Sequence, residues 1–249
     1  MTQVAVGTQI WNYQEIGGGS GRPHGSPLLV LHGWGRNGNE WIQMAKDLSG
    51  WCGRKAYVLD LPGFGGSSLP RVTTIREYSE LVEQFCQYMK IDKAVVVGHS
   101  LGGRVGILMA AKGNSRVEKL VLIDPAGVKP KSIKRVVLKN VAKLFGWVPS
   151  GWRQKMLGRV MDEDYRNSPA LRSLYRVVVG EDLRKYLPKI ACPTLVVWGE
   201  YDQILPLSLT KVYRDKLINV TVRVVWGAGH DPHLTHYDQT LAILQEASE

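Results

Sequence analysis

The sequence predicts an α/β fold built on a mostly parallel, doubly wound sheet. Runs of Val, Leu and Ile of strand length recur along the chain, and each ends in turn residues. Helix-length stretches separate these runs. The runs lack polar alternation, which is typical of strands that helices cover on both faces. A length of 249 residues fits one such domain.

Eight strands are expected in all. Residues 3–16 resemble an antiparallel hairpin that turns at Gly7 and Thr8. Six further strands are expected at 26–33, 54–63, 92–100, 118–127, 192–202 and 220–230. Helices are expected between them, at 39–48, 74–90, 101–112, 207–217 and 234–247. The glycine-rich stretch 17–26 is interpreted as a flexible turn.

The segment 128–186 interrupts this alternation after the sixth strand. Apolar residues recur at helical spacing within 132–148, and only the short stretch 176–180 has a strand-like pattern. The segment holds 14 Lys and Arg against 5 Asp and Glu, so it carries nearly all of the net charge of +10. We expect 128–186 to form a basic helical cap, and 1–127 with 187–249 to form the core.

Composition excludes several other classes of protein. The three cysteines, Cys52, Cys86 and Cys192, are too few and too widely spaced for a disulfide framework or a metal-ligand pair. The N-terminal residues show no basic leader followed by an apolar stretch, and no run of about 18 apolar residues could span a membrane. We therefore expect a cytoplasmic protein. No base-reading motif accompanies the positive charge, so nucleic-acid binding is not expected.

The candidate functional residues lie where predicted strands end. Ligands bind at the carboxyl ends of parallel strands, and the loop 32–35, Ser100, Asp202 and His230 all stand at such ends. A serine hydroxyl needs an adjacent base, and that base needs a third group to orient it. A serine, a carboxylate and a histidine on separate strand ends meet this requirement, in the order expected for a nucleophile elbow.

The surroundings of Ser100 fit such an elbow. Three valines precede the serine and an apolar helical face follows it, so the chain must turn sharply from strand to helix. Gly98 and Gly102 supply the small residues that this turn needs. The Leu101 N–H would open the following helix, where it could stabilise an oxyanion. The Trp34 N–H, at the end of another strand, is expected to be the second donor.

Five motifs in order resemble the α/β-hydrolase-fold serine hydrolases, over nearly the whole chain. The resemblance implies Ser100 as the nucleophile, His230 as the base and Asp202 as the orienting acid, with a cap at 128–186. Some members place the acid at the strand end that Asp124 occupies here, so Asp124 is the alternative acid. The motifs are LHGWG (31–35), DLPGFGGS (60–67), GHSLGG (98–103), WGEYDQILP (198–206) and GAGHDPH (227–233).

The remaining histidines are given smaller roles. His32 is expected to support its loop by hydrogen bonding. His99 lies beside the nucleophile without a necessary role in the chemistry, and with Trp34 it is a candidate substrate-binding residue.

The spacing of His230, His233 and His236 suggests a metal site only superficially. Pro232 fits a helix start there, and no Cys or carboxylate framework accompanies the three rings. The glycines of 63–66 precede no P-loop lysine. We expect neither a metal nor a cofactor.

These observations predict a serine hydrolase that cleaves carboxylic esters of small to medium acyl chains through an acyl-enzyme. One alternative is carbon–carbon hydrolysis of ring-cleavage products, whose enzymes commonly show NSMGG where this chain has HSLGG. Another is a non-catalytic ligand receptor on the same fold. The expected partner is a small-molecule ester.

The basic cap leaves three interpretations open. Its charges can be merely solvated, can bind an acidic partner or anionic substrate, or can bind a membrane surface reversibly. HGWG and DLPGFG also occur in carboxylesterases that act on methyl esters carried by an acyl-carrier protein. That resemblance implies an acidic carrier protein as one candidate partner.

Overall fold

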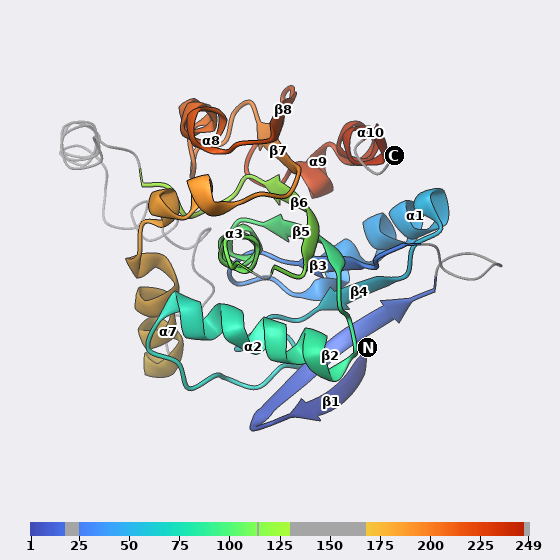
Figure 1. Cartoon of the computed structure of the whole chain (residues 1–249), viewed down its shortest axis with the longest axis vertical. Coiled ribbons are helices and arrows are strands. Elements are labelled where there is room, and N and C mark those ends of the chain that lie inside the picture. The colour runs from blue at the N-terminus through green and yellow to red at the C-terminus, as the bar shows by residue number, and fades with distance from the viewer. Residues whose placement is uncertain (18–24, 114, 130–167, 247–249) are drawn as a thin grey trace, which may run out of the picture.

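The computed structural model describes residues 1–17, 25–113, 115–129 and 168–246. Within them runs an eight-stranded sheet in the order β1-β2-β4-β3-β5-β6-β7-β8 (Figure 1). β1 and β2 pair antiparallel, as do β2 and β4, and the other neighbours are parallel. The expected mostly parallel sheet with an N-terminal hairpin is confirmed. The strands are β1 (Thr2–Val6), β2 (Gln9–Ile16), β3 (Leu28–Leu31), β4 (Ala56–Leu59), β5 (Ala94–His99), β6 (Val117–Ile123), β7 (Thr194–Gly199) and β8 (Val220–Val225).

Helices cover both faces of the sheet. α1 and α10 lie on one side, and α2, α3, α7 and α8 lie on the other (Figure 1). The α-helices are α1 (Ile42–Cys52), α2 (Ile75–Tyr88), α3 (Leu101–Ala110), α7 (Pro169–Gly180), α8 (Thr210–Lys216), α9 (Pro232–Thr235) and α10 (Tyr237–Glu246). Short 3₁₀ turns are η1 (Gly38–Trp41), η2 (Leu183–Lys185), η3 (Leu187–Lys189) and η4 (Leu207–Leu209).

Strand β3 shows why the apolar runs lack polar alternation. Leu29 and Leu31 pack into the core on one face of the sheet, and Leu28 and Val30 pack into the core on the other. None of the four is more than 2% exposed. Successive side chains of a strand point to opposite faces. Both sets must therefore be apolar when helices cover both faces.

Two expected elements differ from the structure. The stretch 176–180 belongs to helix α7 and not to a strand, because Ser168 caps that helix by accepting from the Leu171 N–H at 3.3 Å and Pro169 opens it. The expected helix 234–247 is two helices, since α9 ends before His236 and α10 begins at Tyr237.

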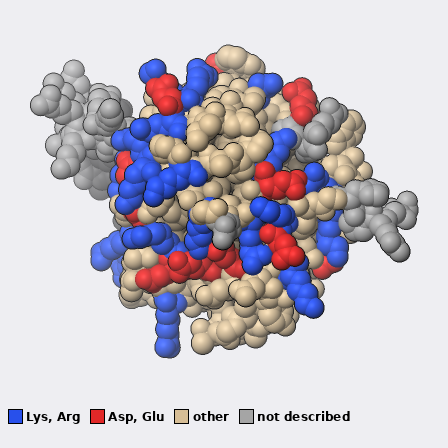
Figure 2. All heavy atoms as spheres, in the orientation of Figure 1, with Lys and Arg blue, Asp and Glu red and all other residues tan. Residues whose placement is uncertain are grey.

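Most of the expected cap falls outside the described residues. The predicted helix 132–148 lies there, as do residues 18–24 of the predicted turn 17–26. Residues 130–167 hold nine Lys and Arg and three Asp and Glu. On the face drawn in Figure 2, basic and acidic side chains are interspersed. Among the described residues of the expected cap, Lys185 pairs with Glu181 at 2.8 Å. Among the described helices, none is long and apolar enough to cross a membrane.

Candidate active site

Ser100 occupies the turn between β5 and α3 with a backbone conformation that few L-residues adopt. Its φ is +48° and its ψ is −104°. The Ser100 N–H donates to the Ile123 carbonyl at 3.1 Å, and the Gly102 N–H donates to the His32 carbonyl at 3.1 Å. Strain of this kind costs about 1–3 kcal/mol and persists only where the surrounding structure imposes it. The turn that the motif predicts is therefore present.

The two glycines of the motif leave no room for a side chain. A Cβ at Gly98 would lie 2.5 Å from the Gly102 carbonyl oxygen, and a Cβ at Gly102 would lie 2.1 Å from the Leu31 carbonyl oxygen. Both obstacles are backbone atoms of packed elements, so they cannot turn aside. The glycines are required by close approach of β3, β5 and α3.

The structure brings Ser100, His230 and Asp202 into one hydrogen-bonded chain. The Ser100 hydroxyl oxygen lies 3.1 Å from His230 Nε2, and His230 Nδ1 lies 2.7 Å from Asp202 Oδ2. With an ionised Asp202, the Nδ1–H donates to the carboxylate and Nε2 is left to accept from the serine. The imidazole is 13% exposed and the Asp202 side chain is fully buried.

Backbone amides hold Asp202 in place. Its second oxygen, Oδ1, accepts from the Ile204 N–H at 2.7 Å and from the Leu205 N–H at 2.8 Å. These bonds come from the turn that follows β7. The remaining oxygen is thereby directed at the histidine.

Asp124, the alternative acid, lies nearby but makes a different bond. Its Oδ1 accepts from the Gly199 N–H at 2.9 Å, and its φ is +40°. Burial, together with the neighbouring charge of Asp202, raises the pKa of Asp124 to about 9. With a pKa this high, the Asp124 carboxyl is protonated at neutral pH. The His230 ring bonds to Asp202 and not to Asp124.

His32 fastens the loop after β3, as expected. Its Nε2 accepts from the Leu61 N–H at 2.8 Å, and its Nδ1 donates to the Gly33 carbonyl at 2.7 Å. Burial lowers the pKa of His32, which favours the neutral ring that this donor and acceptor pair needs. A Cβ at Gly33 would lie 3.5 Å from Ser100 Cβ, so this loop passes directly beside the serine.

Three aromatic rings form a wall next to this loop. Trp34 meets Phe64 with centroids 4.8 Å apart and Tyr175 with centroids 5.1 Å apart, both edge to face. Phe64 belongs to the glycine-rich loop after β4, and Tyr175 belongs to α7 in the described part of the expected cap. The sequence indicated Trp34 but not its two partners, because only the packing of distant segments joins them.

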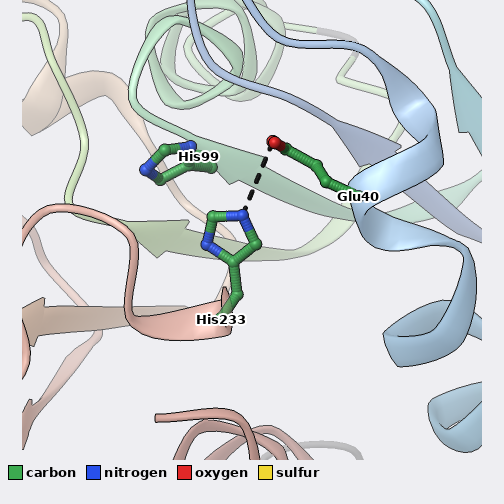
Figure 3. A group of neighbouring side chains, drawn as sticks. All are labelled: Glu40, His99 and His233. Atoms are coloured by element: carbon green, nitrogen blue, oxygen red, sulfur yellow. Dashed lines mark ion pairs between the residues drawn. The ribbon is translucent and has the colours of Figure 1, made fainter. Parts of the chain in front are cut away.

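His99 does not fit the substrate contact expected of it. The residue is 1% exposed, and its Nε2 lies 2.8 Å from the His230 carbonyl oxygen. The ring turns inward, toward Glu40 and His233 (Figure 3). Its position on the last residue of β5 directs it to the face opposite the nucleophile, because successive strand side chains alternate.

The three histidines at 230, 233 and 236 point in different directions. His230 faces Ser100, and His233 faces Glu40 at 3.5 Å. His236 Nε2 lies beside Gly227, within 3.1 Å of where a Cβ would stand. The three rings therefore have three different sets of neighbours.

Asp60 is a supporting residue that sequence analysis missed. It is 2% exposed and accepts from the Gly38 N–H at 2.7 Å, the Gly66 N–H at 2.8 Å and Asn12 Nδ2 at 2.7 Å. These bonds tie together the loops after β3 and β4. A charged residue at the end of an otherwise apolar strand was the available signal.

The family model described as the alpha/beta hydrolase fold matches residues 26–176. The chain belongs to this family. Lipase 3 of a Moraxella species is 29% identical to this α/β hydrolase over 231 residues, which cover 84% of the chain and 72% of the lipase. A pimeloyl-[acyl-carrier protein] methyl ester esterase of Vibrio campbellii is 24% identical over 237 residues, covering 86% of the chain and 91% of the esterase.

The fold of this α/β hydrolase is also similar to solved structures. The crystal structure of a membrane phospholipase A, described as a bacterial virulence factor, superposes with a TM-score of 0.78. It is 27% identical, and the match covers 98% of this chain and 84% of the phospholipase. Family and relatives together support a hydrolase and ester hydrolysis in general.

Proposed function

We propose that this α/β hydrolase cleaves carboxylic esters through an acyl-enzyme, with Ser100 as the nucleophile. The observation that carries the proposal is the continuous chain from the Ser100 hydroxyl through His230 to Asp202, with contacts of 3.1 and 2.7 Å. Such a chain turns an unreactive hydroxyl into a nucleophile at neutral pH. The ester-hydrolysing relatives support this class of bond.

The proposed reaction uses His230 twice. Ser100 Oγ attacks the acyl carbonyl carbon while His230 Nε2 takes its proton, and Asp202 stabilises the resulting imidazolium. The carbon–oxygen bond to the alcohol then breaks, and the alcohol leaves with the proton from His230. Water that gives a proton to the same nitrogen next attacks the acyl-enzyme and releases the acid.

The oxyanion is proposed to lie between the Leu101 and Trp34 N–H groups. Leu101 is the first residue of α3, so its N–H has no acceptor within the helix. Trp34 follows Gly33, whose backbone runs beside Ser100. One such donor contributes about 3–4 kcal/mol of transition-state stabilisation.

The acyl group, a small to medium chain, is proposed to lie against the wall of Trp34, Phe64 and Tyr175, whose rings pack edge to face beside the loop that passes Ser100. Residues 128–186 are proposed to form the cap over it, on the core of 1–127 and 187–249. The described residues give no support to an acidic carrier protein as the partner.

The direct test compares Ser100→Ala with Ser208→Ala, which alters an exposed serine. Ser100→Ala should lower kcat for p-nitrophenyl esters by a factor on the order of 10⁴ or more and abolish fluorophosphonate labelling. Ser208→Ala should retain both. Labelling or hydrolysis that survives in Ser100→Ala, with an unchanged unfolding midpoint, would overturn the assignment.

A further inference from the structure

Three side chains of metal-ligating type, Glu40, His99 and His233, converge next to the serine site (Figure 3). They come from η1, the end of β5 and α9, three segments far apart in sequence. One ligand atom of each lies within 4.8 Å of the other two. Both imidazoles are 1% exposed, and the Glu40 side chain is 12% exposed.

The facing atoms of this group have no hydrogen-bond partner among the residues that the structure describes. Glu40 Oε1, His99 Nδ1 and both ring nitrogens of His233 are buried and unsatisfied. Each such atom costs about 1–3 kcal/mol when left without a partner. Buried polar atoms in native proteins are seldom left so, and a bound ion or water is a common reason.

Neighbouring groups orient His99 and Glu40 so that one ligand atom of each faces the other members of the group. His99 donates from Nε2 to the His230 carbonyl at 2.8 Å, so the lone pair of the neutral ring is on Nδ1. A backbone carbonyl on the second nitrogen is typical of metal-binding histidines. Glu40 Oε2 lies 3.7 Å from Arg36 Nη1, which leaves Oε1 for the rings.

The spacing within the group also fits a shared ion. His233 Nε2 lies 3.5 Å from Glu40 Oε1, which is longer than an ordinary N–H···O hydrogen bond of about 2.7–3.2 Å. Two ligands held at about 2.0–2.1 Å in tetrahedral coordination are about 3.4 Å apart. The observed separation is close to that value.

We propose that Glu40, His99 and His233 bind one divalent transition-metal ion, with Zn²⁺ as the expected occupant. Two imidazoles and one carboxylate suit this ion. The ion would link η1, β5 and α9, which lie beside the segments that bear Ser100 and His230. Binding to the folded chain alone would stabilise it by mass action. The proposal does not depend on ester hydrolysis.

The test titrates the chelator-treated full chain with Zn²⁺, and with Co²⁺ as a spectroscopic probe. Bound metal per chain, the visible bands of four-coordinate Co²⁺ and the thermal unfolding midpoint are measured. The variants are Glu40→Gln, which keeps the side-chain size, and His233→Phe, which keeps a ring on Trp41, where His233 now stacks at 4.1 Å. The control is His236→Asn, on a histidine outside the group.

Wild type and His236→Asn should bind one ion per chain and unfold at a higher temperature with Zn²⁺. Glu40→Gln and His233→Phe should bind at least tenfold more weakly. Equal binding in all four proteins, binding lost only in His236→Asn, or no stoichiometric binding by wild type would overturn the site.

If His233→Phe does not fold, the metal affinity of Glu40→Gln alone tests the site. Ester hydrolysis by metal-free wild type is measured in parallel. Its presence or absence bears on the proposed function, whereas the metal content bears on the site.

Discussion

The carboxyl groups of Asp124 and Asp202 lie together beside the ring of His230, and the ring bonds to Asp202 at 2.7 Å. Asp124 instead accepts from the Gly199 N–H at 2.9 Å, and its raised pKa of about 9 keeps it protonated at neutral pH. A protonated acid beside an ionised one can donate its proton to it. Of the two acids, only Asp202 bonds to the histidine, and Asp124 Oδ2 has no hydrogen-bond partner among the described residues.

Neutralising the two acids should therefore have unequal effects on catalysis. Asp202→Asn should lower kcat on the order of 10⁴-fold, because an amide cannot stabilise the imidazolium or hold the productive tautomer. Asp124→Asn should leave kcat within several-fold, since its amide oxygen can still accept from the Gly199 N–H and His230 bonds to Asp202 instead. Steady-state hydrolysis of a p-nitrophenyl ester measures kcat for both variants. A larger loss of kcat in Asp124→Asn than in Asp202→Asn would make Asp124 the acid.

Asp124 should also make the stability of the fold depend on pH. Its pKa rises from an ordinary value of 3.8 to about 9 on folding, so the folded chain binds more protons between these values. The contribution to the free energy of unfolding is fully present below about pH 4 and is lost as pH rises toward 9. The slope has an upper limit of about 1.4 kcal/mol per pH unit.

Asp124→Asn removes this titration. The variant should become progressively more stable than wild type between pH 5 and about 9, because an amide has no proton to lose. Urea unfolding at several pH values measures the difference in free energy. Parallel pH profiles for the two proteins would contradict the assignment.

The close approach of α3 to β3 should make Gly102 intolerant of any side chain. Gly102→Ala should destabilise the fold by about 3 kcal/mol, because its Cβ would stand 2.1 Å from the Leu31 carbonyl oxygen. Gly50→Ala is the matched control, since its Cβ would meet nothing within 4 Å and it lies in α1. It should raise the free energy of unfolding by about 0.5–1 kcal/mol. A gain in Gly102→Ala similar to that in Gly50→Ala would show that helix propensity, and not this contact, governs the effect.

The aromatic wall should influence which acyl chains are accepted. Tyr175→Ala removes one ring from the wall with Trp34, so kcat/KM for longer acyl chains should change roughly tenfold relative to acetate. Tyr88→Ala, at an exposed tyrosine of α2, should leave the ratio unchanged. A series of p-nitrophenyl esters of increasing length measures the ratio. If the ratio of kcat/KM for longer chains to that for acetate is unchanged in Tyr175→Ala, the aromatic wall does not contact the acyl chain.

The parts that sequence analysis predicted well rest on local patterns. Unbroken apolar runs indicate strands buried on both faces, and Gly98 and Gly102 mark the turn around Ser100. The stretch 176–180 was harder, because its valines favour strands while the cap at Ser168 begins a helix. Local propensity is a weak guide where a cap and packing act against it.

The direction in which the His99 and His233 side chains point could not be predicted from the sequence. His99 is the last residue of β5 and directly precedes Ser100, yet it faces the interior, where it meets Glu40 and His233. The three residues are separated by long stretches of chain, so no spacing rule relates them. Only the closure of η1, β5 and α9 around one point brings their unsatisfied atoms together.

By itself, the sequence determined the α/β architecture, and it indicated Ser100 and His230 together with two alternative acids for the proposed chemistry. It did so because strand periodicity and turn glycines are short-range properties. The tertiary structure decided which of Asp124 and Asp202 bonds to His230, because that choice depends on how two neighbouring strands end and on which carboxyl the surrounding amides direct at the ring.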